Sequence, residues 1–387
     1  MRKSLFWLLG LIGFWSLFYA GFKYFFWGSY ESVSFAPTLE SISWYVLIGS
    51  MIAYVVWGAL YAKLSEKFML FSALVLGSLF FLVWGFLPYV HPVFFPISMI
   101  GLGFSYSLYV IGKNNLIGRE IATSKLGSST IGACTTIIFI VFLIVGTIVG
   151  AKFWENQSIH TIGIFYFLVL LIIAAIALLF TTAAKSKTSF TFSLPLYKKL
   201  FLRYGIFMIG LGCFWQISVE ASQVAINYSK EFFDKSNSAA SFLLLFSSLG
   251  AIIGNIVSVK IAQHRMRSFL VLAILFSITI FSFSSILSLV LKLDQYAIVQ
   301  ALAFTVGLFF WGAVNLAESY FFSLLGNDSD KDYTSALYGF TLSVVGAITM
   351  FLSEKILHSG SYTGISLFLG FLTLIAIFGG WKGIKIR

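Results

Sequence analysis

Long apolar stretches, separated by short polar connections, repeat along almost the whole chain. Each stretch holds about 20 residues, enough for a helix to cross the roughly 30 Å hydrocarbon layer of a bilayer. Because lipid offers no partner for backbone N–H and C=O groups, a segment that crosses it must be helical. The pattern therefore predicts an all-α polytopic membrane protein with 12 transmembrane helices, over residues 5–27, 43–62, 69–88, 93–112, 128–150, 161–183, 204–227, 239–261, 268–291, 296–322, 334–353 and 362–381.

Composition supports a membrane protein. Of the 387 residues 59% are hydrophobic and only 10% are charged, against about 25% charged residues in soluble domains. In a soluble protein the net charge of +11 would suggest nucleic acid. Here the charges fall in the connections, where they set topology and contact anionic headgroups. We therefore expect membrane lipids, and no nucleic acid, as partners.

The basic residues predict an orientation. If the two termini and alternate connections are cytoplasmic, that side holds 19 of the 25 lysines and arginines, and the opposite side holds five. Cytoplasmic loops carry an excess of basic residues. The distribution therefore predicts that both termini are cytoplasmic and that the number of helices is even.

The chain also repeats internally. Gly13-Phe14-Trp15 matches Cys213-Phe214-Trp215 at an offset of 200 residues, and Gly101-Leu102 matches Gly307-Leu308 at an offset of 206. We expect two pseudo-symmetric six-helix bundles, 1–183 and 204–387, joined by a basic cytoplasmic linker, 184–203. This is the plan of transporters that rock around a central site. The glycines at 101 and 103, and those within 250–254, are interpreted as helix-packing positions.

The connection after the second predicted helix resembles the signature loop of the major facilitator superfamily. Four of its residues match that motif: Gly58, Leu60, Lys63 and Lys67. Ala62 replaces the motif's aspartate, and Ser65 replaces its second glycine. The resemblance implies the major facilitator fold and a gating loop that includes Gly58, Lys63, Glu66 and Lys67. Without the aspartate, the cytoplasmic latch of the family is weaker here or is rebuilt with Glu66; the alternative is an ordinary basic loop.

Within that superfamily the chain resembles the bacterial lysophospholipid transporter group. The likeness rests on Gly307-Leu308-Phe309-Phe310 followed by Asn315, on Phe214-Trp215, and on Gly101, Gly103, Lys113, Gly118 and Glu120. The group's acidic residue in the first helix is absent, since Ala20-Gly21-Phe22-Lys23 stands there, and so is its proline before Asn315. The resemblance implies a lipid amphiphile as substrate and the bacterial inner membrane as location. We expect a monomer.

Ionisable residues inside the predicted helices are candidate binding groups, because each costs about 2.5–3.5 kcal/mol at the centre of a membrane helix. Three qualify: Lys23, Glu220 and Glu318. Lys23 and Glu220 could pair across the mouth of a central cavity, or each could reach the headgroups instead. Glu318 could bind a proton, or it could reach the inner interface.

Polar residues accompany Glu220 at helical spacing. Gln216, Glu220, Gln223 and Asn227 share one face of the predicted seventh helix. Such a stripe faces protein or water, so it either lines the cavity or makes interhelical hydrogen bonds. The candidate substrate- or ion-binding set is therefore Lys23, Gln216, Glu220, Gln223, Asn315 and Glu318.

Enzyme chemistry has no support in the sequence. There is no Walker loop, and the four histidines form no cluster with acidic residues at metal-ligand spacing. We expect no enzyme activity, no metal and no cofactor. The leading hypothesis is a secondary active transporter of a lysophospholipid or another amphiphile by alternating access. The alternatives are a proton-coupled transporter of a small organic solute or drug, and a non-transporting scaffold with a degenerate transporter fold.

Overall fold

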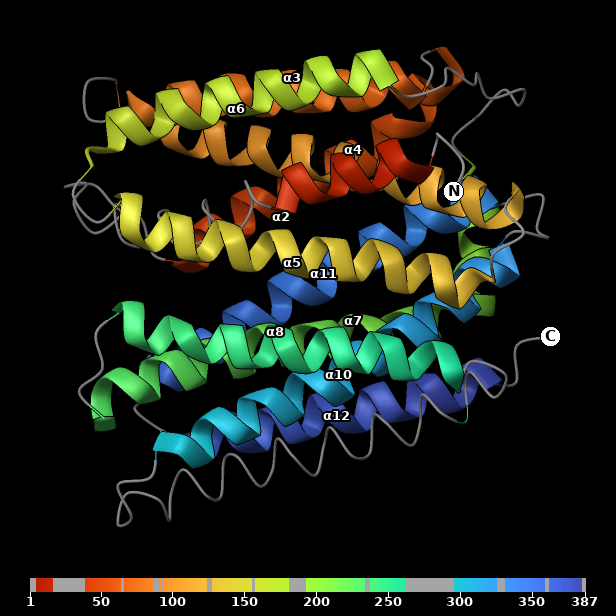
Figure 1. The fold of residues 1–387 in the computed structure, drawn as a ribbon. Coiled ribbons are helices and arrows are strands. Elements are labelled where there is room, and N and C mark those ends of the chain that lie inside the picture. The colour runs from red at the N-terminus through yellow and green to blue at the C-terminus, as the bar shows by residue number, and fades with distance from the viewer. Residues whose placement is uncertain are drawn as a thin grey trace. The chain divides into compact units, whose positions relative to one another are not determined.

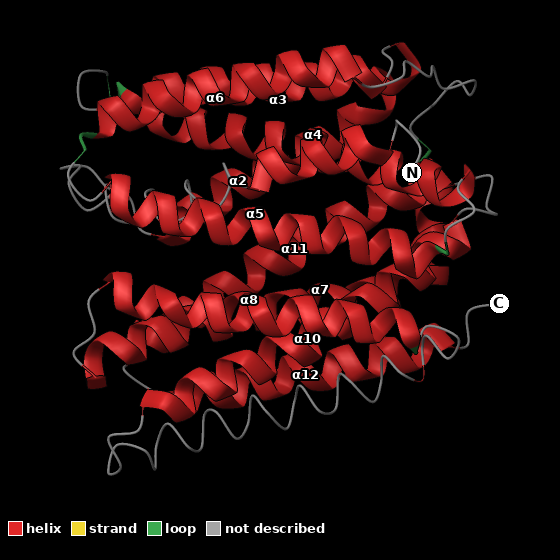
Figure 2. Ribbon diagram, in the orientation of Figure 1, coloured by secondary structure: helices red, strands yellow, loops and turns green. Residues whose placement is uncertain are grey.

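The computed structural model describes residues 5–16, 39–63, 66–86, 91, 93–123, 127–154, 157–180, 193–233, 237–261, 267, 296–325, 331–358 and 362–384. Within these ranges nearly every residue is helical, and no strand occurs among them (Figure 2). The prediction of an all-α protein is confirmed.

The first described helix is the segment Leu5–Ser16. The helices after it follow the predicted order. Their bounds are α2 Leu39–Lys63, α3 Glu66–Gly85, α4 Phe94–Thr123, α5 Ser128–Trp154, α6 Ile159–Phe180, α7 Leu194–Phe233, α8 Asn237–Lys260, α10 Tyr296–Leu325, α11 Lys331–His358 and α12 Tyr362–Ile384. The predicted ninth helix, 268–291, lies outside the described residues.

Helix α7 begins earlier than predicted, because Leu194 and not residue 204 is its first residue. Pro195 stands in its first turn, where a missing N–H costs no helical hydrogen bond. The backbone N–H of Tyr197 donates to the carbonyl of Ser193 at 3.0 Å and closes that turn. The end of the predicted linker, 194–203, is therefore helical.

The helices have the character expected of membrane spans. By length and composition, six of the described ones can cross a bilayer, and five further described helices are apolar but shorter. Helix α12 exposes large apolar side chains along one stripe, formed by Leu367, Phe371, Leu374, Phe378 and Trp381. An apolar stripe of this kind suits lipid rather than water. The chain is an integral membrane protein.

The chain forms two compact units. Unit 1 comprises residues 1–125, 141–198 and 325–343, and unit 2 comprises 126–140, 199–324 and 344–387. In unit 1, α3 packs against α6 and α4, and α2 packs against α4 (Figure 1). The first part of α5 therefore belongs to unit 2, which holds mainly helices from the second half of the sequence. The first part of α11 belongs to unit 1, which holds mainly helices from the first half.

Glycines bring the second and fourth helices of each half into close contact. In unit 1, a Cβ added to Gly49 of α2 would collide with the backbone carbonyl of Ile100 in α4. In unit 2, a Cβ added to Gly250 of α8 would collide in the same way with the carbonyl of Phe304 in α10. Small residues allow membrane helices to approach this closely. The predicted helix-packing role is confirmed for Gly250, whereas Gly49 was not among the predicted positions.

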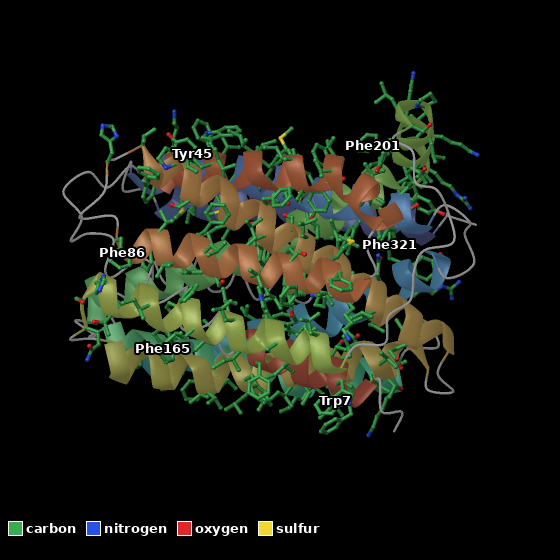
Figure 3. All side chains as sticks on the ribbon, turned by 90° about the horizontal axis from the view of Figure 1, so that it is seen from above. Trp7, Tyr45, Phe86, Phe165, Phe201 and Phe321 are labelled. Carbon is green, nitrogen blue, oxygen red and sulfur yellow. The ribbon has the colours of Figure 1, made fainter. Side chains whose placement is uncertain are left out.

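Apolar side chains cover the outer surfaces of the helices, as Figure 3 shows with side chains as sticks. Phe165 of α6 and Phe201 of α7 are each 44% exposed. Polar side chains are instead found among the buried residues, for example Ser107, Asn255 and Asn315. The interior is largely apolar as well, but exposed apolar groups together with buried polar groups suit a hydrocarbon solvent.

Candidate functional site

The central feature of the site is a carboxylate held by an indole in unit 2. Nε1–H of Trp215 in α7 donates to Oε1 of Glu318 in α10 at 3.1 Å. Both side chains are half-buried, and Glu318 lies within the apolar span Tyr296–Phe321. An ionisable residue placed there is costly unless it has partners and a role. That Glu318 binds a substrate or a proton stays a prediction.

Two further aromatic rings pack against the indole of Trp215. The ring of Trp215 lies 5.2 Å from that of Trp311, at 89°, and 5.6 Å from that of Phe310, at 82°. Phe310 and Trp311 are themselves 5.3 Å apart at 83°. We call Trp215, Phe310 and Trp311 the aromatic corner. Edge-to-face geometry of this kind is favourable for aromatic pairs, so each ring fixes the orientation of the other two.

A buried polar network fixes α10 beside α8. Nδ2 of Asn315 donates to Oγ of Ser258 at 2.6 Å, and the hydroxyl of Ser319 donates to Oδ1 of Asn315 at 3.2 Å. Asn315 is only 3% exposed. These bonds join two membrane helices, which is a structural use of the amide. That Asn315 also binds substrate stays a prediction.

Gln216, the residue after Trp215, is half-buried. Its Nε2 points toward α11, where a Cβ added to Gly346 would lie 2.9 Å away. Its Oε1 is buried and has no hydrogen-bond donor among the described residues. Buried amide oxygens usually have a partner; that Gln216 binds substrate stays a prediction.

Unit 1 carries an aromatic cluster on the corresponding helices of the first half. Trp15, the sequence counterpart of Trp215, stacks on Tyr109 of α4 with ring centroids 4.6 Å apart. In both units, then, the matching tryptophan contacts the fourth helix of its half. The Tyr109 hydroxyl is buried and has no hydrogen-bond partner among the described residues. The Tyr54 hydroxyl lies beside those of Ser107 and Ser343.

The side chains of the remaining predicted site residues, Lys23, Glu220 and Gln223, are outside the described set. Lys23 lies outside the described residues altogether, whereas Glu220 and Gln223 lie on α7. The Lys23–Glu220 pair therefore stays a prediction.

Neither a protein-family model nor a curated protein matches the sequence. Several solved structures are similar to the chain. The major facilitator superfamily transporter FucP, in an outward conformation, is similar to this chain with a TM-score of 0.72 at 13% identity, over 99% of both chains. The human organic anion transporter MFSD10 (TETRAN) has a TM-score of 0.76 at 10% identity, over 98% of this chain and 99% of its own.

The chain has the major facilitator fold. A variant of the E. coli fucose:proton symporter FucP is similar as well, with a TM-score of 0.68 at 15% identity over 99% of both chains. Identities this low establish the fold and leave the activity to be argued from the site. The fold predicted from the signature loop and the duplication is confirmed.

The loop that resembles the major facilitator signature joins α2 to α3. Helix α2 contains Gly58 and ends at Lys63, and α3 begins at Glu66. Lys67 is half-buried. The side chains of Lys63 and Glu66 are outside the described set, so the gating role of the loop stays a prediction.

One feature of the site was not predicted from the sequence: the Trp215–Glu318 hydrogen bond, whose partners are 103 positions apart. The available signal was the acidic residue within an apolar helix, and it does not identify a neighbour. A second unpredicted feature lies in unit 1, where Glu120 of α4 is 7% exposed and its Oε2 has no hydrogen-bond partner among the described residues.

Proposed function

We propose that this chain is a secondary active transporter that works by alternating access, and that Glu318 is the ionisable group of its binding site. The proposal is supported by the major facilitator fold. It is also supported by the position of a carboxylate inside an apolar span. In alternating access, two bundles expose one site first to one side of the membrane and then to the other.

The Trp215–Glu318 hydrogen bond carries the proposal. A scaffold protein would gain nothing from retaining a carboxylate that costs about 2.5–3.5 kcal/mol inside the membrane. In a transporter, a residue of this kind binds the substrate or the coupling ion. Among the described residues, no group of three or more His, Cys, Asp or Glu side chains is placed to hold a metal ion, so the proposal invokes a small-molecule or lipid substrate.

Two substrate classes suit the site. The aromatic corner favours an amphiphile such as a lysophospholipid, which could enter from the lipid phase. The carboxylate of Glu318 favours a small organic solute whose movement is coupled to a proton. The similar structures belong to proteins described as a fucose:proton symporter and an organic anion transporter, and such different solutes show that the fold does not select the substrate.

The test of alternating access needs no known substrate. In a background without Cys134 and Cys213, a single cysteine is introduced as Gln216→Cys. A membrane-impermeant maleimide is then added outside intact cells or to inside-out vesicles. We expect labelling from both sides, because both open states expose the site in turn.

The matched control lies on the same helix. Leu202 is 76% exposed near the start of α7, on the side predicted to be cytoplasmic, so Leu202→Cys should be labelled from that side only. Labelling of Gln216→Cys from one side alone, or from neither, would reject alternating access and favour the non-transporting scaffold.

A further inference from the structure

We propose that Glu318 and the aromatic corner form a binding site for an organic ammonium group. The proposal rests on the proposed function and specifies the chemistry of the substrate. It is carried by the geometry of four side chains in unit 2: Trp215, Phe310, Trp311 and Glu318.

The hydrogen bond orients the indole of Trp215. Its N–H edge points at Oε1 of Glu318 at 3.1 Å. The edge of an aromatic ring is electropositive and its face is electronegative. The carboxylate takes the positive edge, so a positive charge near this ring would be attracted to its face. The carboxylate and the ring face thus both favour a positively charged ligand.

The ring of Trp311 adds a second electronegative face, since it lies at 89° to the ring of Trp215. Phe310 is fully buried and stacks on Phe214 with ring centroids 5.1 Å apart, so it holds the two indoles in place and offers no face to a ligand. Quaternary and protonated ammonium groups are recognised by the faces of aromatic rings, to which their charge is attracted.

Asn315 lies about one turn from both Trp311 and Glu318, on the same face of α10. It is bonded to Ser258 of α8 at 2.6 Å, so α8 fixes the face of α10 that carries the two site residues. The side that carries Trp311 is turned toward α5, where the ring of Phe139 lies 6.3 Å away. Trp215, Trp311 and Glu318 are all half-buried. They therefore retain surface that a ligand can cover, unlike the fully buried Phe310.

Other ligands suit these groups less well. An anion would be repelled by the carboxylate. Small metal cations prefer several oxygen ligands, and three of the four side chains here offer only aromatic rings. A weakly hydrated organic cation can use both the carboxylate and the rings. Two sources supply such a group: a free amine or quaternary ammonium solute, and the choline or ethanolamine headgroup of a lysophospholipid.

The experiment measures equilibrium binding to the full chain in lipid nanodiscs. The probes are radiolabelled choline, tetraethylammonium, lysophosphatidylcholine and lysophosphatidylglycerol, the last of which lacks an ammonium group. We expect at least one ammonium probe to bind. Glu318→Gln should weaken that binding by about tenfold or more, and Trp311→Leu by about fivefold. Glu318→Asp, which keeps the charge, should retain most of it.

Two control variants test specificity. Trp381 lies on the exposed stripe of α12, so Trp381→Leu removes a tryptophan without touching the site. Thr305 of α10 bonds only within its own helix among the bonds described, to the carbonyl of Ala301 at 2.8 Å. Both Trp381→Leu and Thr305→Ala should leave binding unchanged.

The probes also separate the two sources. Binding of choline or tetraethylammonium indicates a free solute. Binding of lysophosphatidylcholine, without either small cation and in preference to lysophosphatidylglycerol, indicates the headgroup. The proposal is overturned if no ammonium probe binds, if both lysophospholipids bind equally well, or if binding is unaffected by Glu318→Gln. These outcomes are independent of the cysteine-labelling result, so failure of this site and failure of alternating access can be told apart.

Discussion

Gly307 of α10 lies directly against Ser247 of α8, so that an added Cβ would collide with the serine's backbone carbonyl. Gly103 of α4 lies against the carbonyl of Val46 in α2 in the same way. The two contacts join the second and fourth helices of their respective halves. Because they recur at the same places, the duplication of the sequence is also a duplication of helix packing.

We predict that Gly307→Ala and Gly103→Ala each destabilise the fold by at least about 1–3 kcal/mol, since the backbone of the partner helix must move to admit a methyl group. Gly118→Ala on α4 is the control, because no atom lies within 4 Å of its added Cβ. It should be neutral or slightly stabilising, because alanine has a higher helix propensity than glycine. Apparent unfolding temperatures of purified protein measure all three. Equal effects at Gly103 and Gly118 would contradict the close approach.

Hydropathy predicted the helices well, but the short sequence repeats aligned the two halves two residues out of register in the fourth helix. Hydropathy found most of the described helices because each must be long and apolar. The dipeptide match paired Gly101 with Gly307, whereas the contacts pair Gly103 with Gly307. A Cβ added to Gly101 would instead meet the ring of Phe80 in α3. Two glycines two positions apart lie on different faces of a helix, and only the neighbouring helices show which one is equivalent.

The network around Asn315 gives the second prediction. Asn315→Ala removes the donor to Ser258 and the acceptor of Ser319, so it should lower stability by about 1–2 kcal/mol, the usual range for interhelical hydrogen bonds in membranes. Thr305→Ala on the same helix should change stability little. In a double-mutant cycle, Asn315→Ala and Ser258→Ala together should cost less than the sum of the two single changes. Strict additivity would mean that this bond contributes no coupling.

Tyr54 and Gly339 give the third prediction, in unit 1. A Cβ added to Gly339 of α11 would lie 2.6 Å from Cε1 of Tyr54 in α2. Gly339→Ala should therefore destabilise the protein by about 1–3 kcal/mol. Tyr54→Leu removes the clashing ring, so the double variant should recover at least about 0.5 kcal/mol relative to additivity. Ile348→Ala, at an exposed position of α11, should combine additively with Tyr54→Leu.

The site was harder to predict than the fold. The sequence singled out Glu318 because a carboxylate within an apolar helix is costly. It could not supply Trp215 as its partner, since that pairing depends on how α7 packs against α10. It also suggested Asn315 as a ligand for the substrate. The structure shows the amide bonded to Ser258 and Ser319, a use that no local pattern distinguishes from substrate binding.

Gln216 gives the last prediction, which separates function from stability. Its buried Oε1 has no hydrogen-bond donor among the described residues, and an unsatisfied buried polar atom costs about 1–3 kcal/mol. Gln216→Leu replaces the amide with an apolar group of similar size. If the oxygen were merely structural, its removal would change neither binding nor transport. If it is an acceptor kept for a ligand, stability should stay equal or rise while ligand binding falls about five- to tenfold. The two readouts are the apparent unfolding temperature and equilibrium binding of the same ammonium probes, compared with Thr305→Ala. Lower stability with unchanged binding would assign Gln216 to helix packing and remove it from the site.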